Sequence, residues 1–336
     1  MSKGMLPTVT DEFGFYEMRF ESIGGLGAHL AGQILAEAGV LGQGLNGAHF
    51  SSYGSEKKGT PVKSFVRLCA PDREVRSAAP ITRPHLVAVF HEALIRTENV
   101  TAGLRPDGII LVNTTRTPEE MKAKLKLESG TVAVIDALKI AVEEKTRVNT
   151  AMLGAVARIA DFIDPDIVRD AIKHTFEHKY PQLVAANLRT FDRGYEELKM
   201  VEFKAAPGVE PKPFVKPGPL YGYLDAPIGG IIVNPGNSAL KDLSSSRQGF
   251  LPEFNREKCT DCAQCDLVCP DFCFTWTPGQ DKRGRPAMVL QGIDYQYCKG
   301  CLKCVEACPF GALVAARETE DYAESHRVPR NLAVHA

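Results

Sequence analysis

Hydrophobic and polar positions alternate with two different periods from about residue 15 to residue 200. Tyr16, Met18 and Phe20 alternate with charged residues, and a period of two predicts a strand. Between the strand-like segments, apolar residues recur at helical spacing, as in residues 30–38 and 118–127. Further short apolar runs predict strands at 62–68, 86–90, 108–112 and 131–135. The alternation predicts an α/β, Rossmann-like open sheet with helices on its faces.

The pattern changes twice after this region. Residues 148–200 look helical throughout, with breaks at Asp164-Pro165 and Tyr180-Pro181. Five prolines then fall within residues 205–219, and such a stretch forms a semi-rigid, extended spacer. We therefore predict an α/β domain over 1–204, a proline-rich linker over 205–220, and a second domain with a C-terminal tail over 221–336.

Charge and apolar content exclude two broad classes of protein. With 40 Lys+Arg against 41 Asp+Glu, the chain lacks the basic excess of a nucleic-acid binder. Its longest apolar runs are strand-sized, far short of the roughly 20 residues that cross a membrane. The first twenty residues have no signal-peptide pattern, so we expect no membrane partner and a cytoplasmic location. Because thiols stay reduced there, clustered cysteines indicate a metal centre rather than disulfides.

Nine of the ten cysteines lie between residues 259 and 308, and eight of them form a repeat. Each copy reads Cys-x2-Cys-x2-Cys-x3-Cys-Pro, whereas zinc sites use paired Cys-x2-Cys units farther apart. Three such cysteines can hold three corners of one [4Fe–4S] cluster, while the fourth points toward the other cluster. The predicted ligand sets are Cys259, Cys262, Cys265 and Cys308 for cluster 1, and Cys298, Cys301, Cys304 and Cys269 for cluster 2. The second domain is therefore predicted to be an α+β, ferredoxin-like 2[4Fe–4S] domain.

Two cysteines and one charged segment are left over from this assignment. Cys273, between Phe272 and Phe274, and Cys69, at the end of a predicted strand, are interpreted as buried free thiols. Residues 282–286 are interpreted as a solvated hairpin tip. The alternative is an electrostatic patch that steers an acidic electron carrier toward the nearby cluster.

Two loops of the first domain are candidate binding sites. Gly24, Gly25 and Gly27 follow a strand and open a helix, a position where backbone amides accept anions. Leu30 stands where the dinucleotide fingerprint needs a third glycine, so we expect a structural turn or a loop facing a partner's cofactor. Residues 51–61 are predicted to be a polar loop. It is either a solvated loop with an ion pair or one whose amides hold a carboxylate or phosphate together with Lys58.

These motifs in this order resemble a known family. Residues 24–27, the loop at 52–59 and residues 148–155 resemble the gamma subunit of 2-oxoacid:ferredoxin oxidoreductases. Residues 236–244 and 247–252 and the double cysteine motif resemble the delta, ferredoxin-like subunit of that family. The resemblance covers about residues 18–316 and predicts a fused gamma–delta subunit. One departure is Lys58, where the family usually has arginine, and lysine loses the bidentate geometry.

The resemblance implies that the decarboxylation and the electron transfer take place on different chains. Thiamine diphosphate and Mg would lie on alpha- and beta-type partner subunits, and this chain would pass electrons through its two clusters to external ferredoxin. Its substrate would be pyruvate, oxalate or a similar 2-oxo acid. No catalytic residue is assigned to this chain, because Pro106-Asp107-Gly108 lacks the first glycine of the thiamine diphosphate signature. The loops at 24–27 and 52–60 would form a wall or lid at the partners' site, with Gly24, Gly25, Gly27 and Lys58 as cofactor-binding candidates.

Two other classes stay open. One is a stand-alone ferredoxin-type electron carrier that docks on another dehydrogenase. The other is an NAD-dependent enzyme with a ferredoxin tail, against which the incomplete glycine fingerprint counts.

Overall fold

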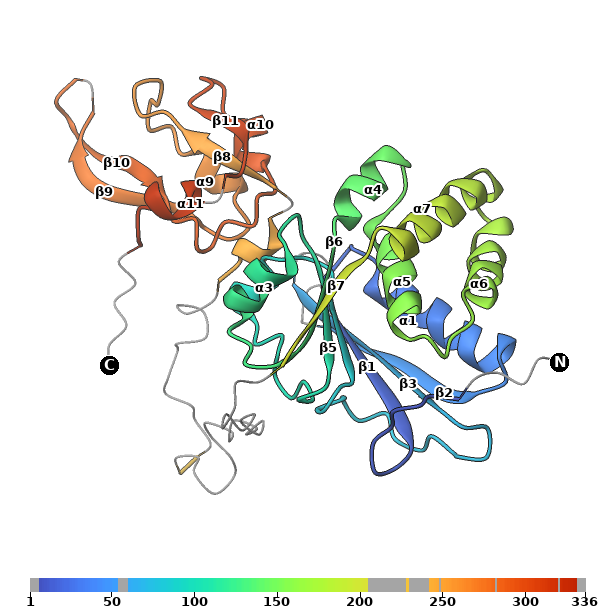
Figure 1. Ribbon diagram of the computed structural model, residues 1–336. Coiled ribbons are helices and arrows are strands. Elements are labelled where there is room, and N and C mark those ends of the chain that lie inside the picture. Colours follow the sequence, from blue (N-terminus) through green and yellow to red (C-terminus); the bar gives the residue numbers. More distant parts are fainter. Residues whose placement is uncertain are drawn as a thin grey trace. The chain divides into compact units, whose positions relative to one another are not determined.

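A computed structural model describes residues 6–53, 60–204, 228–229, 242–247, 249–281, 283–319 and 321–330 (Figure 1). The chain divides into two compact units, Met1–Lys216 and Pro217–Ala336. The predicted proline-rich linker at 205–220 lies outside the described residues.

The first unit is built on a mixed seven-stranded sheet in the order β2-β3-β1-β4-β5-β6-β7. Its central strands β1, β4, β5 and β6 are parallel, while β3, β2 and β7 add antiparallel pairs toward the edges. The bounds are β1 (Phe15–Ile23), β2 (Asn46–Tyr53), β3 (Pro61–Cys69), β4 (Leu86–Val89), β5 (Ile109–Asn113), β6 (Gly130–Ile135) and β7 (Lys199–Phe203). The parallel centre confirms the predicted α/β class.

Helices cover both faces of this sheet (Figure 1). Their bounds are α1 (Ala28–Glu37), the π-helical turn η1 (Ala38–Gly42), α2 (Leu94–Thr97), α3 (Pro118–Leu125), α4 (Ala137–Glu143), α5 (Val148–Ile159), α6 (Pro165–Glu177), η2 (Pro181–Leu183) and α7 (Val184–Glu196). The predicted start at Pro118 is confirmed and explained by a capping box. Thr117 accepts a hydrogen bond from the Glu120 amide, and the Glu120 side chain accepts one from the Thr117 amide.

The central strands bury both of their faces. Leu86 and Ala88 of β4 belong to the core shared with α1, α4, α5, α6 and α7, whereas Val87 and Val89 belong to the core beneath α2 and α3. Figure 1 shows α1 and α4–α7 on one side of the sheet and α3 on the other. Burial on both faces explains why these strands read as continuous apolar runs.

The charged half of the β1 pattern is also buried. Glu17 accepts a hydrogen bond from Arg67 Nε at 2.6 Å, and Glu21 lies 2.7 Å from Arg19 Nε and 3.5 Å from Lys63 Nζ. All three β1 side chains are at least nine-tenths buried as whole residues. The apolar residues of β1 therefore face a hydrophobic core, and the charged residues on its other face form a buried ion-pair network and do not face water.

Two sequence predictions in this unit were wrong, and both concern antiparallel strands at the sheet edges. Ser51 to Tyr53 were predicted to lie in a loop but belong to β2, and residues 199–200 were predicted to be helical but begin β7. Edge strands are only partly covered, so their polar side chains resemble those of loops and exposed helices.

Helices α5 and α7 approach each other through two glycines. A Cβ atom on Gly154 would overlap the carbonyl oxygen of Phe191, and one on Gly194 would overlap the carbonyl oxygen of Ala151. Each glycine therefore lets the backbone of the other helix fit directly against its own.

The second unit contains two short antiparallel pairs and short helices among its described residues. The pairs are β8 (Phe250–Phe254) with β11 (Leu313–Arg317), and β9 (Phe274–Gln280) with β10 (Pro286–Ile293). The helical segments are η3 (Ser244–Ser246), α9 (Gln264–Val268), α10 (Lys303–Ala307) and α11 (Tyr322–Ser325). The predicted hairpin tip is confirmed between β9 and β10. There Arg285 Nη2 lies 2.7 Å from Asp281, while Lys282 lies outside the described residues.

Candidate metal centres

The two cysteine repeats fold into loops of the same backbone shape. In the first copy Asp261, Ala263 and Phe272 have left-handed φ angles of 58°, 60° and 50°. The corresponding positions of the second copy are Gly300, Leu302 and Gly311, with φ angles of 69°, 60° and 61°. Because non-glycine residues rarely adopt this conformation, its recurrence at matching positions shows that the loop shape is required.

One cavity is lined by the first three cysteines of the first copy and by the last cysteine of the second. These are Cys259, Cys262, Cys265 and Cys308. Most of the remaining wall is apolar and includes Phe254, Trp276, Leu290 and Leu313. Four thiol donors converging on an apolar space fit a [4Fe–4S] cluster.

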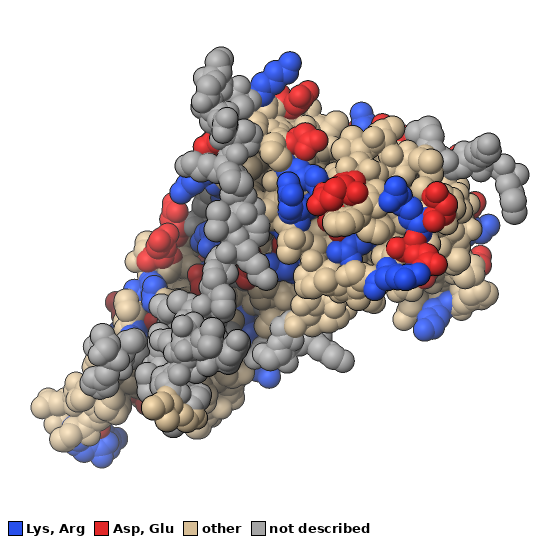
Figure 2. Space-filling view, turned by 90° about the horizontal axis from the view of Figure 1, so that it is seen from below, with Lys and Arg blue, Asp and Glu red and all other residues tan. Residues whose placement is uncertain are grey.

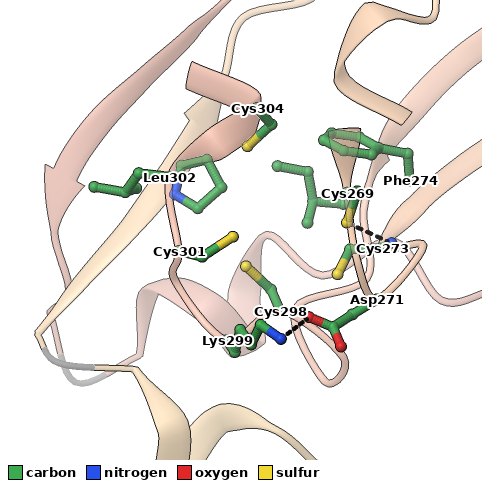
Figure 3. Close-up of a pocket in the computed structure, with 11 residues that line it drawn as sticks. Cys269, Asp271, Cys273, Phe274, Cys298, Lys299, Cys301, Leu302 and Cys304 are labelled. Atoms are coloured by element: carbon green, nitrogen blue, oxygen red, sulfur yellow. Dashed lines mark hydrogen bonds and ion pairs between the residues drawn. The ribbon is translucent and has the colours of Figure 1, made fainter. Parts of the chain in front are cut away.

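A second cavity has the same kind of lining. It is lined by Cys298, Cys301, Cys304 and Cys269, so again three cysteines come from one copy and the fourth from the other (Figure 3). Phe274, Ile293 and Leu302 supply apolar wall. The structure thus brings the cysteines together in the two predicted groups of four, and their role as iron ligands stays a prediction.

Cys273 is a fifth cysteine at the second cavity (Figure 3). The neighbouring thiols of Cys269 and Cys298, together with burial, raise its pKa. Its backbone amide donates to Cys269 Sγ at 3.4 Å. Cys273 and Cys69 are both buried, as interpreted from the sequence. The sequence did not reveal that Cys273 faces the predicted ligands, because that contact joins the two copies.

Charged side chains fix the binding loops. The Asp261 carboxylate accepts hydrogen bonds from Arg256 at 2.5 Å and from the Leu290 amide at 2.9 Å. The guanidinium of Arg247 is almost fully buried and donates to the carbonyl oxygens of Tyr295 at 2.8 Å and Cys298 at 3.1 Å. This anchoring role was not predicted, since a single arginine outside the repeat carries no local signal for it.

In the first unit, residues 24–27 connect β1 to α1 as predicted. The Gly24 amide donates to the Thr60 carbonyl at 2.9 Å. Gly27 has a φ of 82°, and a Cβ atom there would lie 2.9 Å from Cγ of the buried Asn149. The loop is therefore packed against α5. Lys58 lies outside the described residues, and a cofactor-binding role for this loop and Lys58 stays a prediction.

Two histidines that the sequence analysis did not single out lie near this loop. His29 Nδ1 is 3.0 Å from Ser51 Oγ, His49 Nε2 is 2.9 Å from Ser64 Oγ, and the two rings are 4.8 Å apart. Burial, and secondarily His29, lowers the pKa of His49 to about 4, which keeps it neutral near pH 7. This pair was not predicted, because the strand that carries His49 was not recognised and residues 51–53 were predicted to be a loop.

The surface seen in Figure 2 carries lysine and arginine interspersed with aspartate and glutamate, in keeping with the near-zero net charge. Among the described residues, no helix combines the length and the apolar character that a membrane crossing requires.

Two family models match different parts of the chain. Residues 17–197 match the model described as pyruvate ferredoxin/flavodoxin oxidoreductase, and residues 258–312 match a 4Fe-4S dicluster domain. The first match spans more than half of the chain. The second covers both cysteine repeats and supports two [4Fe–4S] clusters in this region.

Curated relatives match just over half of this chain and nearly all of their own length. The pyruvate/ketoisovalerate oxidoreductases common subunit gamma of Pyrococcus furiosus is 37% identical over 188 residues, 55% of this chain and 98% of that protein. The NADH-dependent phenylglyoxylate dehydrogenase subunit gamma of Aromatoleum evansii is 33% identical over 195 residues, 57% of this chain and 99% of that protein. A crystal structure of pyruvate oxidoreductase subunit PORC from Thermotoga maritima is 34% identical, covers 56% of this chain and 99% of its own, and has a TM-score of 0.49.

Proposed function

Because the chain belongs to the pyruvate ferredoxin/flavodoxin oxidoreductase family, we propose that it is the electron-exit subunit of a 2-oxo acid oxidoreductase complex. Alpha- and beta-type partner subunits would hold thiamine diphosphate and Mg and decarboxylate the 2-oxo acid. The two electrons released would leave through this chain to an external ferredoxin. The gamma-type domain and the dicluster domain are joined in one polypeptide, as in a fused gamma–delta subunit.

The observation that carries the proposal is the pair of four-cysteine cavities in a chain that also has a gamma-type unit. We assign Cys259, Cys262, Cys265 and Cys308 to one cluster, and Cys298, Cys301, Cys304 and Cys269 to the other. When bound, [4Fe–4S] clusters supply reversible one-electron transfer, which suits a reaction that releases two electrons per substrate.

The surrounding residues have roles that follow from their contacts. The apolar walls around Trp276 and Phe274 lower water access to the sulfurs. Backbone amides donate to ligand sulfurs, as Asp261 does to Cys259 at 3.4 Å, and so stabilise negative charge there. Arg247 holds the loop of Cys298 through that residue's carbonyl oxygen.

The relatives support the substrate class. Pyruvate, ketoisovalerate and phenylglyoxylate, which appear in their names, are all 2-oxo acids. We propose a substrate of this class, pyruvate, oxalate or a similar small 2-oxo acid, and place its recognition mainly on the partner subunits. The loop of Gly24, Gly25 and Gly27, together with Lys58, is proposed to line the partners' cofactor site.

Anaerobic isolation of the complex through an affinity tag on this chain tests the proposal. We expect two larger chains to co-purify with bound thiamine diphosphate, and about eight irons per copy of this chain. Adding a 2-oxo acid should bleach the broad visible absorption of the clusters.

A chain that is recovered with its iron but without thiamine diphosphate or larger partners would contradict the proposal. That result would favour a stand-alone ferredoxin-type carrier instead. Bleaching by NADH in the absence of any 2-oxo acid would favour an NAD-dependent enzyme.

A further inference from the structure

The second cavity differs from the first in one chemical respect. Cys273 lies four residues after Cys269, and Ala312 holds the same place four residues after Cys308. Both residues line their cavities and both are 3% exposed. One cavity therefore has a thiol at the position where its counterpart has a methyl group.

The thiol of Cys273 points at the predicted ligands. It lines the same cavity, its backbone amide donates to Cys269 Sγ at 3.4 Å, and its sulfur lies beside that of Cys269 in Figure 3. Because four cysteines already supply the four corners of a cubane cluster, a fifth cysteine at this cavity has no iron to bind. A thiol that binds no metal has an S–H group that can donate a hydrogen bond.

A hydrogen bond to a ligand sulfur favours the reduced cluster. Reduction adds one negative charge, part of which resides on the sulfurs, and a donor stabilises the more negative state more strongly. Ala312 offers no such donor at the other cavity.

On the basis of the proposed function, we propose that Cys273 is a positioning residue whose S–H donates to a ligand sulfur and raises the reduction potential of the cluster held by Cys298, Cys301, Cys304 and Cys269. The two clusters then differ in potential although their ligand sets are alike. Electrons settle first on the cluster beside Cys273, and the other cluster is the stronger reductant.

Redox titration of the anaerobically purified full chain, followed by visible absorption and electron paramagnetic resonance, tests this. Cys273→Ala should shift one of the two one-electron reduction waves to lower potential. The equilibrium constant for reduction of that cluster should fall by about threefold to tenfold. This corresponds to about 30 to 60 mV. Cys273→Ser keeps a donor and should leave that wave near or above its wild-type position. Ala312→Cys adds the missing donor and should raise the other wave.

The iron content shows whether a negative result contradicts the ligand assignment or only the tuning role of Cys273. A wild-type chain that does not reach about eight irons contradicts the ligand assignment itself. With about eight irons retained, unmoved waves in both Cys273→Ala and Ala312→Cys would overturn the tuning role. Loss of about four irons in Cys273→Ala would also overturn it, since it would make Cys273 necessary for holding the cluster.

Discussion

Replacing Cys269 is expected to abolish the cluster held by the second cysteine repeat and to spare the cluster whose other ligands lie beside it in sequence. The reason is that Cys269 lines the cavity of Cys298, Cys301 and Cys304. The test variant is Cys269→Ser combined with Cys273→Ala, so that no neighbouring thiol can replace the lost ligand. Iron should fall from about eight to about four per chain, as measured by iron analysis after anaerobic purification.

Double replacements establish which cluster is lost. Adding Cys298→Ser to that variant should cost no further iron, because both changes affect the same cluster. Adding Cys259→Ser should remove the remaining four or so irons, since it disables the other cluster. If Cys259→Ser cost nothing more and Cys298→Ser removed the rest, each cluster would be held within one repeat and the exchange of ligands between the repeats would be wrong.

Gly194→Ala is expected to destabilise the first unit severely. Helix propensity alone would make this change stabilising by about 1 kcal/mol. In the structure, however, the added Cβ overlaps the backbone carbonyl of Ala151, and a backbone atom cannot rotate away. Overpacking of this kind costs about 3 kcal/mol, so the net loss is about 2 kcal/mol, which lowers the melting temperature of a unit of this size by about 4 to 8 °C.

Thermal unfolding followed by circular dichroism measures this effect. The control is Ala185→Gly at an exposed position in the first turn of the same helix, for which at most the propensity cost of about 1 kcal/mol is expected. A melting temperature of Gly194→Ala at or above that of the wild type would show that α5 and α7 do not pack as closely as the structure has them.

The sequence predicted those parts of the fold in which local pattern and tertiary environment agree. Strands such as β4 and β5 are buried on both faces, and the open α/β sheet that contains them was predicted from the alternation of such apolar runs with helix-like segments. Strand β2 was not predicted, because its strand conformation depends on hydrogen bonds to the neighbouring strand β3 and its own composition does not indicate a strand. Glu17 and Glu21 show a further limit, since nothing local indicates that a charged face will be buried against Arg67 and Lys63.

At the predicted cluster sites, the spacing of the cysteines along the chain was the main basis of the prediction. The repeat predicted which cysteines would gather, because three cysteines in a tight loop and a fourth on the next turn have few other arrangements. Cys273 and Arg247 could not be placed in the same way. Their contacts depend on how the second repeat folds against residues far away in the chain, as the hydrogen bond from Arg247 to the Cys298 carbonyl does.

The most direct test of the central claim is the rate of ferredoxin reduction by the assembled complex with a 2-oxo acid as the only electron source. We compare the wild type with the variant Cys259→Ser/Cys298→Ser, which lacks one ligand of each cluster but leaves the gamma-type unit unchanged. The variant is expected to assemble with the thiamine-binding partners as the wild type does and to reduce ferredoxin at least about a hundredfold more slowly, about 2.7 kcal/mol in barrier height. Ferredoxin reduction at the wild-type rate by this variant would contradict the central claim.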